Sequence, residues 1–283
     1  MPSRTAPKKK LPAPPPEPVK VASSVEERTA YLESRLKGAS PEVQAEYRND
    51  LDICWIAHDS ALEGVVYTLA ELRTAIGGGD AHVTFDSSTQ PVVEEIRRHR
   101  EALNLIREHA VKRRVPVTVD LIKRIYCVVH PEEGDVKTVK YRKDIPQHRL
   151  YFHEYTPPDK IAYKLRQIMD WVNDPETRRT RTPVRLAARA HYEILRIFPF
   201  ANDSGKVARL VMNLLLLRTG YPPAIIHSTE RQRYYEALKG SSATMNAIVQ
   251  DAIENSLSSI EKLLDGYDTK RTGGLLYEPR SGG

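Results

Sequence analysis

The amino-acid sequence predicts a mainly α-helical domain that carries one short β-hairpin. Three observations support this fold class. Apolar residues recur at helical spacing over most of residues 23–265. Helix start signals such as Ser40-Pro41, and Gly-then-Pro stop signals such as Gly220-Tyr221-Pro222-Pro223, separate these stretches. Residues 136–152 instead have the composition of paired strands, with a turn near Pro146.

The first half of the chain contains four stretches with helical periodicity. Ser23 or Ser24 caps the first of them, and Ser40-Pro41 begins the second. Gly77-Gly78-Gly79 follows no predicted strand and lacks the spacing of a phosphate-binding loop, so we expect a flexible turn there. The expected helices are residues 24–36, 41–62, 91–109 and 117–129.

The second half contains the most apolar helix of the chain. Its apolar positions fall at helical spacing and nearly encircle it, so it belongs in the middle of the domain. These positions are Val207, Leu210, Val211, Leu214, Leu215, Leu216 and Leu217. We expect residues 174–183 to form a basic loop. The expected helices are residues 156–172, 184–197, 207–217, 228–238 and 241–264.

The two ends of the chain differ in composition from its middle. Residues 1–22 are rich in Pro and Lys, and we expect them to be disordered or polyproline-like. Five basic residues face one acidic residue in residues 1–25, so this tail holds +4 of the net charge of +6. This distribution disfavours a nucleic-acid-binding face. We expect one domain over residues 23–265, with its core in about 53–240, and a flexible tail over 266–283.

The composition also bears on the compartment. No run approaches the about 18 apolar residues that a membrane span needs, and no apolar signal region follows the basic residues of the N-terminus. Cys54 and Cys127 lie in apolar-patterned segments without metal-ligand spacing, so we expect buried free thiols in a reducing compartment. The expected location is the cytoplasm.

A short polar loop joins the two central helices. Asn202, Asp203 and Ser204 are all good N-cap residues. A helix N-terminus presents free backbone N–H groups and the positive end of the helix dipole, so it favours an anion. Lys206 and Arg209 add positive charge there. The sequence therefore predicts an anion-binding loop that includes Gly205.

This loop resembles the signature of the Fic (Fido-fold) family, which reads His-Pro-Phe-x-Asp/Glu-Gly-Asn-Gly-Arg-x-x-Arg. The matching positions are Pro199, Phe200, Gly205 and Arg209, with Lys206 in place of the first arginine. The differing positions are Phe198 for the family histidine, Asn202 for the acid, Asp203 for the glycine and Ser204 for the asparagine. Further sequence similarity to the family extends over roughly residues 53–240. The resemblance implies a Fic-like helical bundle with a β-hairpin flap.

Two other segments resemble parts of the family that have functional roles. Glu63-Gly64 resembles the end of the family's inhibitory helix, whose glutamate pairs with the second motif arginine, here Arg209; Asp59 occupies the family's Ser/Thr position. A surface glutamate beside a helix-ending glycine is the alternative. The family places contacts to the adenine end of the nucleotide in the helix that here holds Tyr234 and Tyr235.

Tyr141-Arg142 lies where the family has the flap that aligns a target polypeptide by edge pairing. An exposed strand edge can bind an extended segment of a protein partner by strand addition. A hairpin that merely covers the core is the alternative. The sequence does not indicate the oligomeric state or the identity of a protein target.

The resemblance implies transfer of AMP from ATP with Mg²⁺ to a protein hydroxyl, started by the motif histidine. Phe198 has no titratable group and cannot take that proton. Asn202 is a weak ligand for Mg²⁺, whereas Asp203 offers a carboxylate that could act as a relocated base or metal ligand. We expect His191 to be a partly buried imidazole with its hydrogen bonds satisfied, rather than a catalyst.

Two functions remain open on the sequence. The first is a catalytically impaired Fic-fold protein that acts as a binding or regulatory module. The second is a divergent transferase of AMP, or of another nucleotide-linked or phosphorylated group, that uses a rebuilt anion loop. ATP with Mg²⁺ is the cofactor that the second function requires.

Overall fold

The computed structural model describes residues 24–77, 89–146 and 154–275, with side chains through residue 267. All regular structure in these ranges is helical. The first helices are α1 (Val25–Gly38), α2 (Pro41–Leu62), α3 (Leu69–Ile76), α4 (Gln90–Val111), α5 (Val119–Val129) and the 3₁₀ turn η1 (Pro131–Glu133). The later ones are η2 (Pro158–Lys160), α6 (Ile161–Asn173), α7 (Pro175–Thr180), α8 (Pro183–Ile197), α9 (Ser204–Arg218), η3 (Ser228–Glu230), α10 (Arg231–Lys239) and α11 (Ser242–Leu275).

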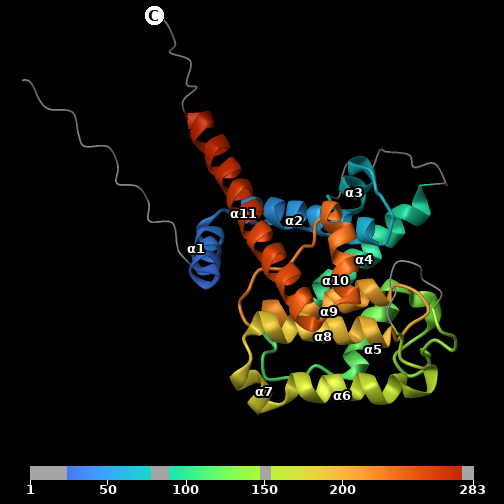
Figure 1. Ribbon diagram of the computed structural model, residues 1–283. Helices are drawn as coiled ribbons and strands as arrows, with labels where there is room; N and C mark the ends of the chain where they lie inside the picture. Colours follow the sequence, from blue (N-terminus) through green and yellow to red (C-terminus); the bar gives the residue numbers. More distant parts are fainter. Residues whose placement is uncertain (1–23, 78–88, 147–153, 276–283) are drawn as a thin grey trace, which may run out of the picture.

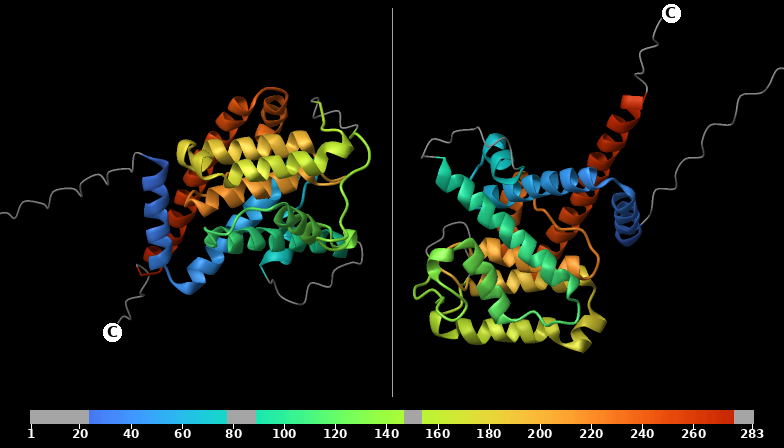
Figure 2. Two further views of the ribbon diagram at one scale, coloured as in Figure 1. Left: turned by 90° about the horizontal axis from the view of Figure 1, so that it is seen from below. Right: turned by 180° about the vertical axis from the view of Figure 1, so that it is seen from behind.

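Helices α8 and α9 form the centre of the molecule (Figure 1). Helix α4 packs on α9 from one side, and α6 covers α8 from the other, so the helices lie in layers (Figure 2). In α9 every residue is buried except the half-buried Leu217. The apolar stripe that nearly encircles this stretch in the sequence therefore marks the central helix, as predicted.

The predicted helix starts are present as side-chain caps. The Ser24 hydroxyl accepts a hydrogen bond from the Glu27 N–H, and the Glu27 carboxylate accepts one from the Ser24 N–H. The Ser40 hydroxyl accepts from the Val43 N–H, with Pro41 in the first turn of α2. Each such cap is worth about 1 kcal/mol, because it satisfies an N–H group that the helix itself leaves free.

Three helical segments differ from the expectation. Helix α3 is not among the expected helices, although Thr68 and Glu71 form a capping box at its start. The predicted basic loop contains α7, because the Asp174 carboxylate accepts from the Thr177 N–H and Pro175 fills the first turn. The last helix, α11, continues to Leu275 rather than ending at Leu264. Buried Tyr267 extends its packed face, and the Tyr267 hydroxyl donates to Asp50 at 2.6 Å, so tertiary contacts outweigh the cost of Gly266 inside a helix.

The predicted β-hairpin is wrong for its first half, because residues 136–146 form no strand. Local hydrogen bonds compete with a strand here: an Asp135 carboxylate oxygen accepts from the N–H groups of Lys137 and Thr138, at 2.8 and 3.0 Å. Residues 147–152 lie outside the described residues, as do residues 1–22 and most of the predicted triple-glycine turn. Strand addition at this segment therefore stays a prediction.

Cys54 and Cys127 are free thiols, as predicted, but half-buried rather than fully buried. Burial raises the pKa of both. Across the described ranges, no helix is both long and apolar enough to span a bilayer.

Candidate functional site

The loop between α8 and α9 begins and ends with a left-handed residue. Phe198 closes α8 with φ 48° and ψ 67°, and Asp203 precedes α9 with φ 47° and ψ 22°. Asp tolerates this region through its short polar side chain, whereas Phe occupies it only under constraint. Such a residue costs about 1–3 kcal/mol, so the surrounding structure must fix it.

Arg142 supplies much of that constraint at Phe198. Its buried guanidinium donates to the carbonyl oxygens of Phe198 at 2.6 Å and Ile197 at 3.0 Å, and also to that of Thr156. Its backbone N–H donates to the Pro199 carbonyl at 3.0 Å. The Phe198 ring, only 6% exposed, meets the Tyr155 ring edge-on with centroids 5.3 Å apart. Arg142 therefore holds the loop; its predicted role in aligning a target is a separate matter that stays a prediction.

The middle of the loop is also closed by internal contacts. The Phe200 ring stacks on Tyr126 with centroids 3.9 Å apart. The fully buried Ser204 hydroxyl donates to the Phe200 carbonyl and accepts from the Phe200 N–H, both at 2.9 Å. Asn202 is exposed and Gly205 is buried. The Ser204 hydroxyl is therefore committed to the loop itself.

The first loop cation, Lys206, is almost fully buried beside two carboxylates. Its Nζ lies 3.4 Å from Asp203 Oδ1 and 3.9 Å from Glu95 Oε1. Asp203 Oδ2 lies 2.8 Å from His130 Nε2, and His130 Nδ1 lies 2.8 Å from Glu132 Oε1. The Asp203 carboxylate is therefore occupied by contacts with Lys206 and His130 of the same chain.

The His130–Asp203 contact shifts both ionisations. The hydrogen bond to Asp203, supported by Glu132, raises the pKa of His130 although burial opposes the charge. Burial favours a neutral Asp203, but the bond to His130 and the charge of Lys206 outweigh it and lower the pKa of Asp203. His130 and Asp203 therefore each favour the charged form of the other.

The second loop cation, Arg209, is held by two carboxylates of α2. Its Nε lies 2.5 Å from Asp59 Oδ1 and its Nη2 lies 3.2 Å from Asp59 Oδ2, a two-pronged contact. Its Nη1 lies 2.8 Å from Glu63 Oε1. Burial opposes the charge on both Asp59 and Arg209, but their attraction lowers the pKa of Asp59 and raises that of Arg209. The expected Glu63–Arg209 contact is present, and Asp59 adds a second one.

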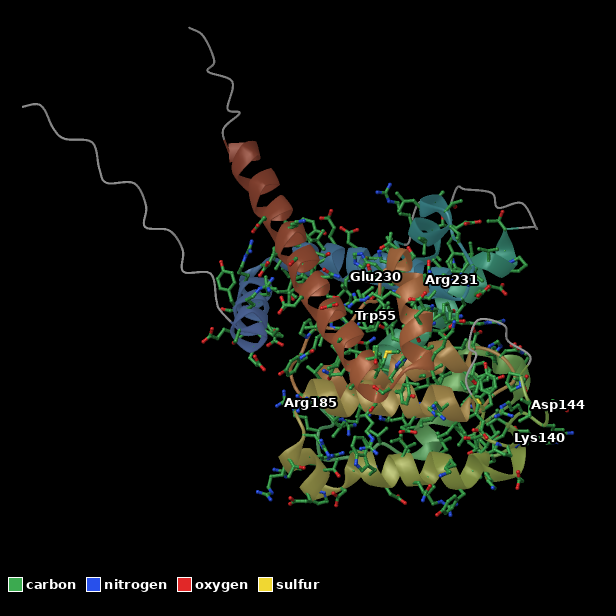
Figure 3. The ribbon with its side chains drawn as sticks, viewed as in Figure 1. Trp55, Lys140, Asp144, Arg185, Glu230 and Arg231 are labelled. Carbon is green, nitrogen blue, oxygen red and sulfur yellow. The ribbon has the colours of Figure 1, made fainter. Side chains whose placement is uncertain are left out.

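The two predicted nucleotide-contacting tyrosines are buried behind Arg209. Tyr234 Oη lies 3.4 Å from Arg209 Nη1 and 3.0 Å from His191 Nε2. The Tyr235 hydroxyl donates to the Leu62 carbonyl at 2.6 Å, just before the positive-φ residue Gly64. Tyr235 thus contacts the end of α2 directly, whereas Tyr234 contacts Arg209 and His191; both follow the start of α10, where Figure 3 labels Glu230 and Arg231.

Two further histidines near Arg209 are neutral. His191 is fully rather than partly buried, its Nε2 contacts Tyr234 while its Nδ1 has no hydrogen-bond partner among the described residues, and burial lowers its pKa to about 3. Burial also lowers the pKa of His99 to about 4, although Asp59 Oδ2 lies 3.5 Å from its Nε2. Neither ring adds positive charge to the loop at neutral pH.

Sequence analysis missed His130 and the charge role of Asp59. His130 lies 73 positions before Asp203, and no motif or spacing connects them. Asp59 occupies a position where the resemblance expects Ser or Thr, so the sequence contained a signal: an extra acid opposite a retained arginine.

Contacts within the chain already occupy the charged groups that would attract a metal–nucleotide complex. Both cations that would attract phosphates contact carboxylates of the chain itself. Among the described residues, no group of three or more His, Cys, Asp or Glu side chains could hold a metal ion. In this arrangement a phosphate group would therefore compete with these carboxylates for both loop cations.

Comparison with known proteins gives consistent results. Residues 116–216 match the Fic/DOC family. The Protein adenylyltransferase Fic of Drosophila willistoni is 31% identical over 190 residues, which cover 65% of this chain and 36% of the relative. The Protein adenylyltransferase fic-1 of Caenorhabditis elegans is 26% identical over 231 residues, which cover 76% and 42%. The chain thus spans less than half the length of these curated relatives.

Solved structures show the same fold. A Fic domain containing signaling protein from Bacteroides thetaiotaomicron superposes with a TM-score of 0.68 at 22% identity, covering 84% of this chain and 98% of that one. Fic-1 (aa134–508) from C. elegans superposes with a TM-score of 0.64 at 22% identity, covering 87% and 73%. At this identity the likeness concerns the fold.

Proposed function

Because this chain belongs to the Fic/DOC family, we propose that it is a Fic-fold protein without AMP-transfer activity that acts as a binding or regulatory module. The observation that carries this proposal is Phe198. A buried phenyl ring occupies the position at which the resemblance requires the catalytic histidine. Removing a general base costs on the order of 10²–10⁴-fold in rate.

The described residues near the loop offer no ready substitute for that base. His130 contacts the loop through Asp203, but both of its ring nitrogens lie beside carboxylates, those of Asp203 and Glu132. Asp203 carries a lowered pKa and already contacts His130 and Lys206, so it is a weak proton acceptor. In this arrangement neither group is free to accept a proton from a target hydroxyl.

The electrostatics of the loop support the same proposal. Lys206 lies near Asp203 and Glu95, and Arg209 contacts Asp59 and Glu63. A triphosphate would have to displace carboxylates of like charge before it could contact either cation. Displacement would also leave carboxylates buried without a counter-ion, which costs several kcal/mol per ion by order of magnitude.

The second candidate function is a divergent transferase. The geometry that favours it is the left-handed turn at Asp203 followed by the buried start of α9, which preserves the frame of an anion-binding loop. This function requires the loop to rearrange so that Asp203 releases His130 and Lys206. Binding of ATP with Mg²⁺ is its minimum requirement.

A stepwise reversion tests the proposal. Full-length protein incubated with radiolabelled ATP and Mg²⁺ should not label itself, and Glu63→Gly alone should not change this, because Asp59 still contacts Arg209. A variant that combines Phe198→His, Asn202→Asp, Asp203→Gly and Ser204→Asn with Asp59→Ser and Glu63→Gly should gain self-labelling.

The matched control carries the same changes but keeps Phe198, and it should label itself on the order of 10²-fold less than the full reversion or not at all. Robust AMP transfer by the unaltered chain, abolished by Arg209→Ala, would contradict the proposal and favour the divergent transferase.

A further inference from the structure

A basic groove runs between α6 and α8, away from the altered loop's charged cluster. The two helices lie side by side in all three ribbon views (Figures 1 and 2). Two cavities of about 540 and 460 Å³ adjoin along this groove, because they share Trp171 and Arg189 in their walls, and the start of α11 borders the second. Its basic side chains are Lys160, Lys164, Arg181, Arg185, Arg189 and Arg196. We call this surface the α6/α8 groove.

In the described part of the chain, the exposed cations of the groove form no ion pairs, although Glu154 and Glu193 also line it. By contrast, the exposed Arg179 contacts Glu176 at 2.8 Å, and Arg233 contacts Glu230 and Asp251 at 3.0 and 2.6 Å. The unpaired set is Lys160, Lys164, Arg181, Arg185 and Arg189.

The spacing of these cations makes them repel one another when no partner is bound. Lys160 and Lys164 are four residues apart at the start of α6, and Arg185 and Arg189 are four residues apart on α8. Like charges at this spacing destabilise a helix by about 0.2–0.5 kcal/mol per pair. Figure 3 labels Arg185 near the first turn of α8, where the helix dipole also disfavours a cation. An external anion would relieve these repulsions.

We propose that the α6/α8 groove binds an extended acidic segment of a protein partner. Discrete carboxylates suit the groove better than a continuous polyphosphate, because Glu154 and Glu193 interrupt its basic lining. Its two aromatic side chains are also not free for base stacking: the Arg189 guanidinium lies over the Trp171 ring, 4.6 Å from its centroid, and Tyr155 is buried against Phe198. Single-stranded nucleic acid needs both a continuous basic track and open aromatic faces.

One end of the groove touches the elements that hold the altered loop. Tyr155, Thr156 and Ile197 line this end. The Tyr155 ring contacts the Phe198 ring, and the Arg142 guanidinium donates to the carbonyls of Thr156 and Ile197. A segment bound in the groove would therefore lie against the supports of Phe198. This inference rests on the proposed binding role and names its partner class.

A fluorescein-labelled octaglutamate peptide, titrated with full-length protein at low ionic strength, tests the inference. We expect measurable binding that weakens as salt screens the charges. The double variant Arg181→Glu/Arg185→Glu should raise Kd by about tenfold, since each reversed contact changes the binding energy by a fraction of a kcal/mol to one kcal/mol. The variant Arg185→Glu/Arg189→Glu should act similarly.

The matched control reverses two exposed arginines between α4 and α5, Arg113→Glu/Arg114→Glu, and gives the same net charge. It should change Kd by less than about twofold. Unaltered thermal melting confirms that each variant folds. Because no nucleotide is involved, the inference can fail while the lack of AMP transfer stands.

Three results would overturn the inference. The first is an absence of peptide binding. The second is an equal loss in the control pair, or a loss confined to Lys8→Ala/Lys9→Ala/Lys10→Ala, which would indicate general attraction to a basic chain. The third is tighter binding of an RNA octanucleotide at the same groove residues, which would make the partner a nucleic acid.

Discussion

The cations of the altered loop and those of the α6/α8 groove have opposite surroundings. Lys206 and Arg209 are 3% and 2% exposed, and each lies beside two carboxylates. Arg185 and Arg189 are exposed and make no ion pair in the described part of the chain. Burial explains the first case, because a charge removed from water must be paired. Exposure to water explains the second case, because water solvates these charges without a counter-ion.

This difference divides the cations into two kinds: those of the loop stabilise the fold, and those of the groove are available to bind a partner. In the loop, pairing consumes the positive charge that a phosphate would need. In the groove, water screens the repulsion between like charges, and a partner can gain by replacing that water. The positions that the resemblance marks for nucleotide chemistry are therefore the ones least available to an external anion.

Breaking the Asp59–Arg209 pair should give the largest effect on stability. Asp59→Ala removes the two-pronged contact and leaves a buried guanidinium with Glu63 alone, so the free energy of unfolding should fall by about 3 kcal/mol. Urea denaturation followed by circular dichroism measures this. Asp59→Leu with Arg209→Met should recover much of the loss, since the two most deeply buried charges are removed together and the remaining Glu63 side chain is 17% exposed.

The exposed groove supplies the matched control for that change. Arg185→Glu also alters one charge, but it should shift the free energy of unfolding by less than about 0.5 kcal/mol. A loss below about 1 kcal/mol for Asp59→Ala would show that the α2 contact is not the main support of Arg209.

His130→Gln should give a smaller loss that depends on pH. The folded-state pKa of His130 is raised above its unfolded value, so its contribution is fully present below the unfolded pKa of about 6.5 and is lost as pH rises through the folded pKa. We expect a loss of about 1–2 kcal/mol at pH 6 that shrinks toward zero at pH 9.

Urea denaturation at the two pH values measures this difference, with His58→Gln as a control because the pKa of His58 is lowered by burial and by His227. An equal loss at both pH values for His130→Gln would mean that its packing, not its charge, supports the loop. Asp203 acts with the opposite sign: its contribution is present above its unfolded pKa of about 3.8 and is lost as pH falls.

Local signals predicted much of the fold. Ser24 and Ser40 cap the first two helices as their sequence context indicates, and the stripe that begins at Val207 marks the buried helix. The same reasoning failed at residues 174–183, where the cap at Asp174 begins a short helix that basic composition obscured. It also failed at residues 136–146, where side-chain bonds to the backbone replace the predicted strand.

The candidate site was predictable only in part. Arg209 and Glu63 could be placed together through the resemblance, and their contact is present. The pairing of His130 with Asp203 depends on how α5 packs beside the loop, which no local pattern specifies. The hold of Arg142 on the Phe198 carbonyl depends on tertiary structure in the same way.

The most direct test of the account is a calorimetric titration of the full-length chain with ATP and Mg²⁺. Because both loop cations lie beside carboxylates, we predict no detectable binding up to a concentration of about 1 mM, which corresponds to a binding free energy weaker than about −4 kcal/mol. Micromolar binding that disappears in Lys206→Ala would contradict the account, since the loop would then hold a nucleotide despite its own acidic groups.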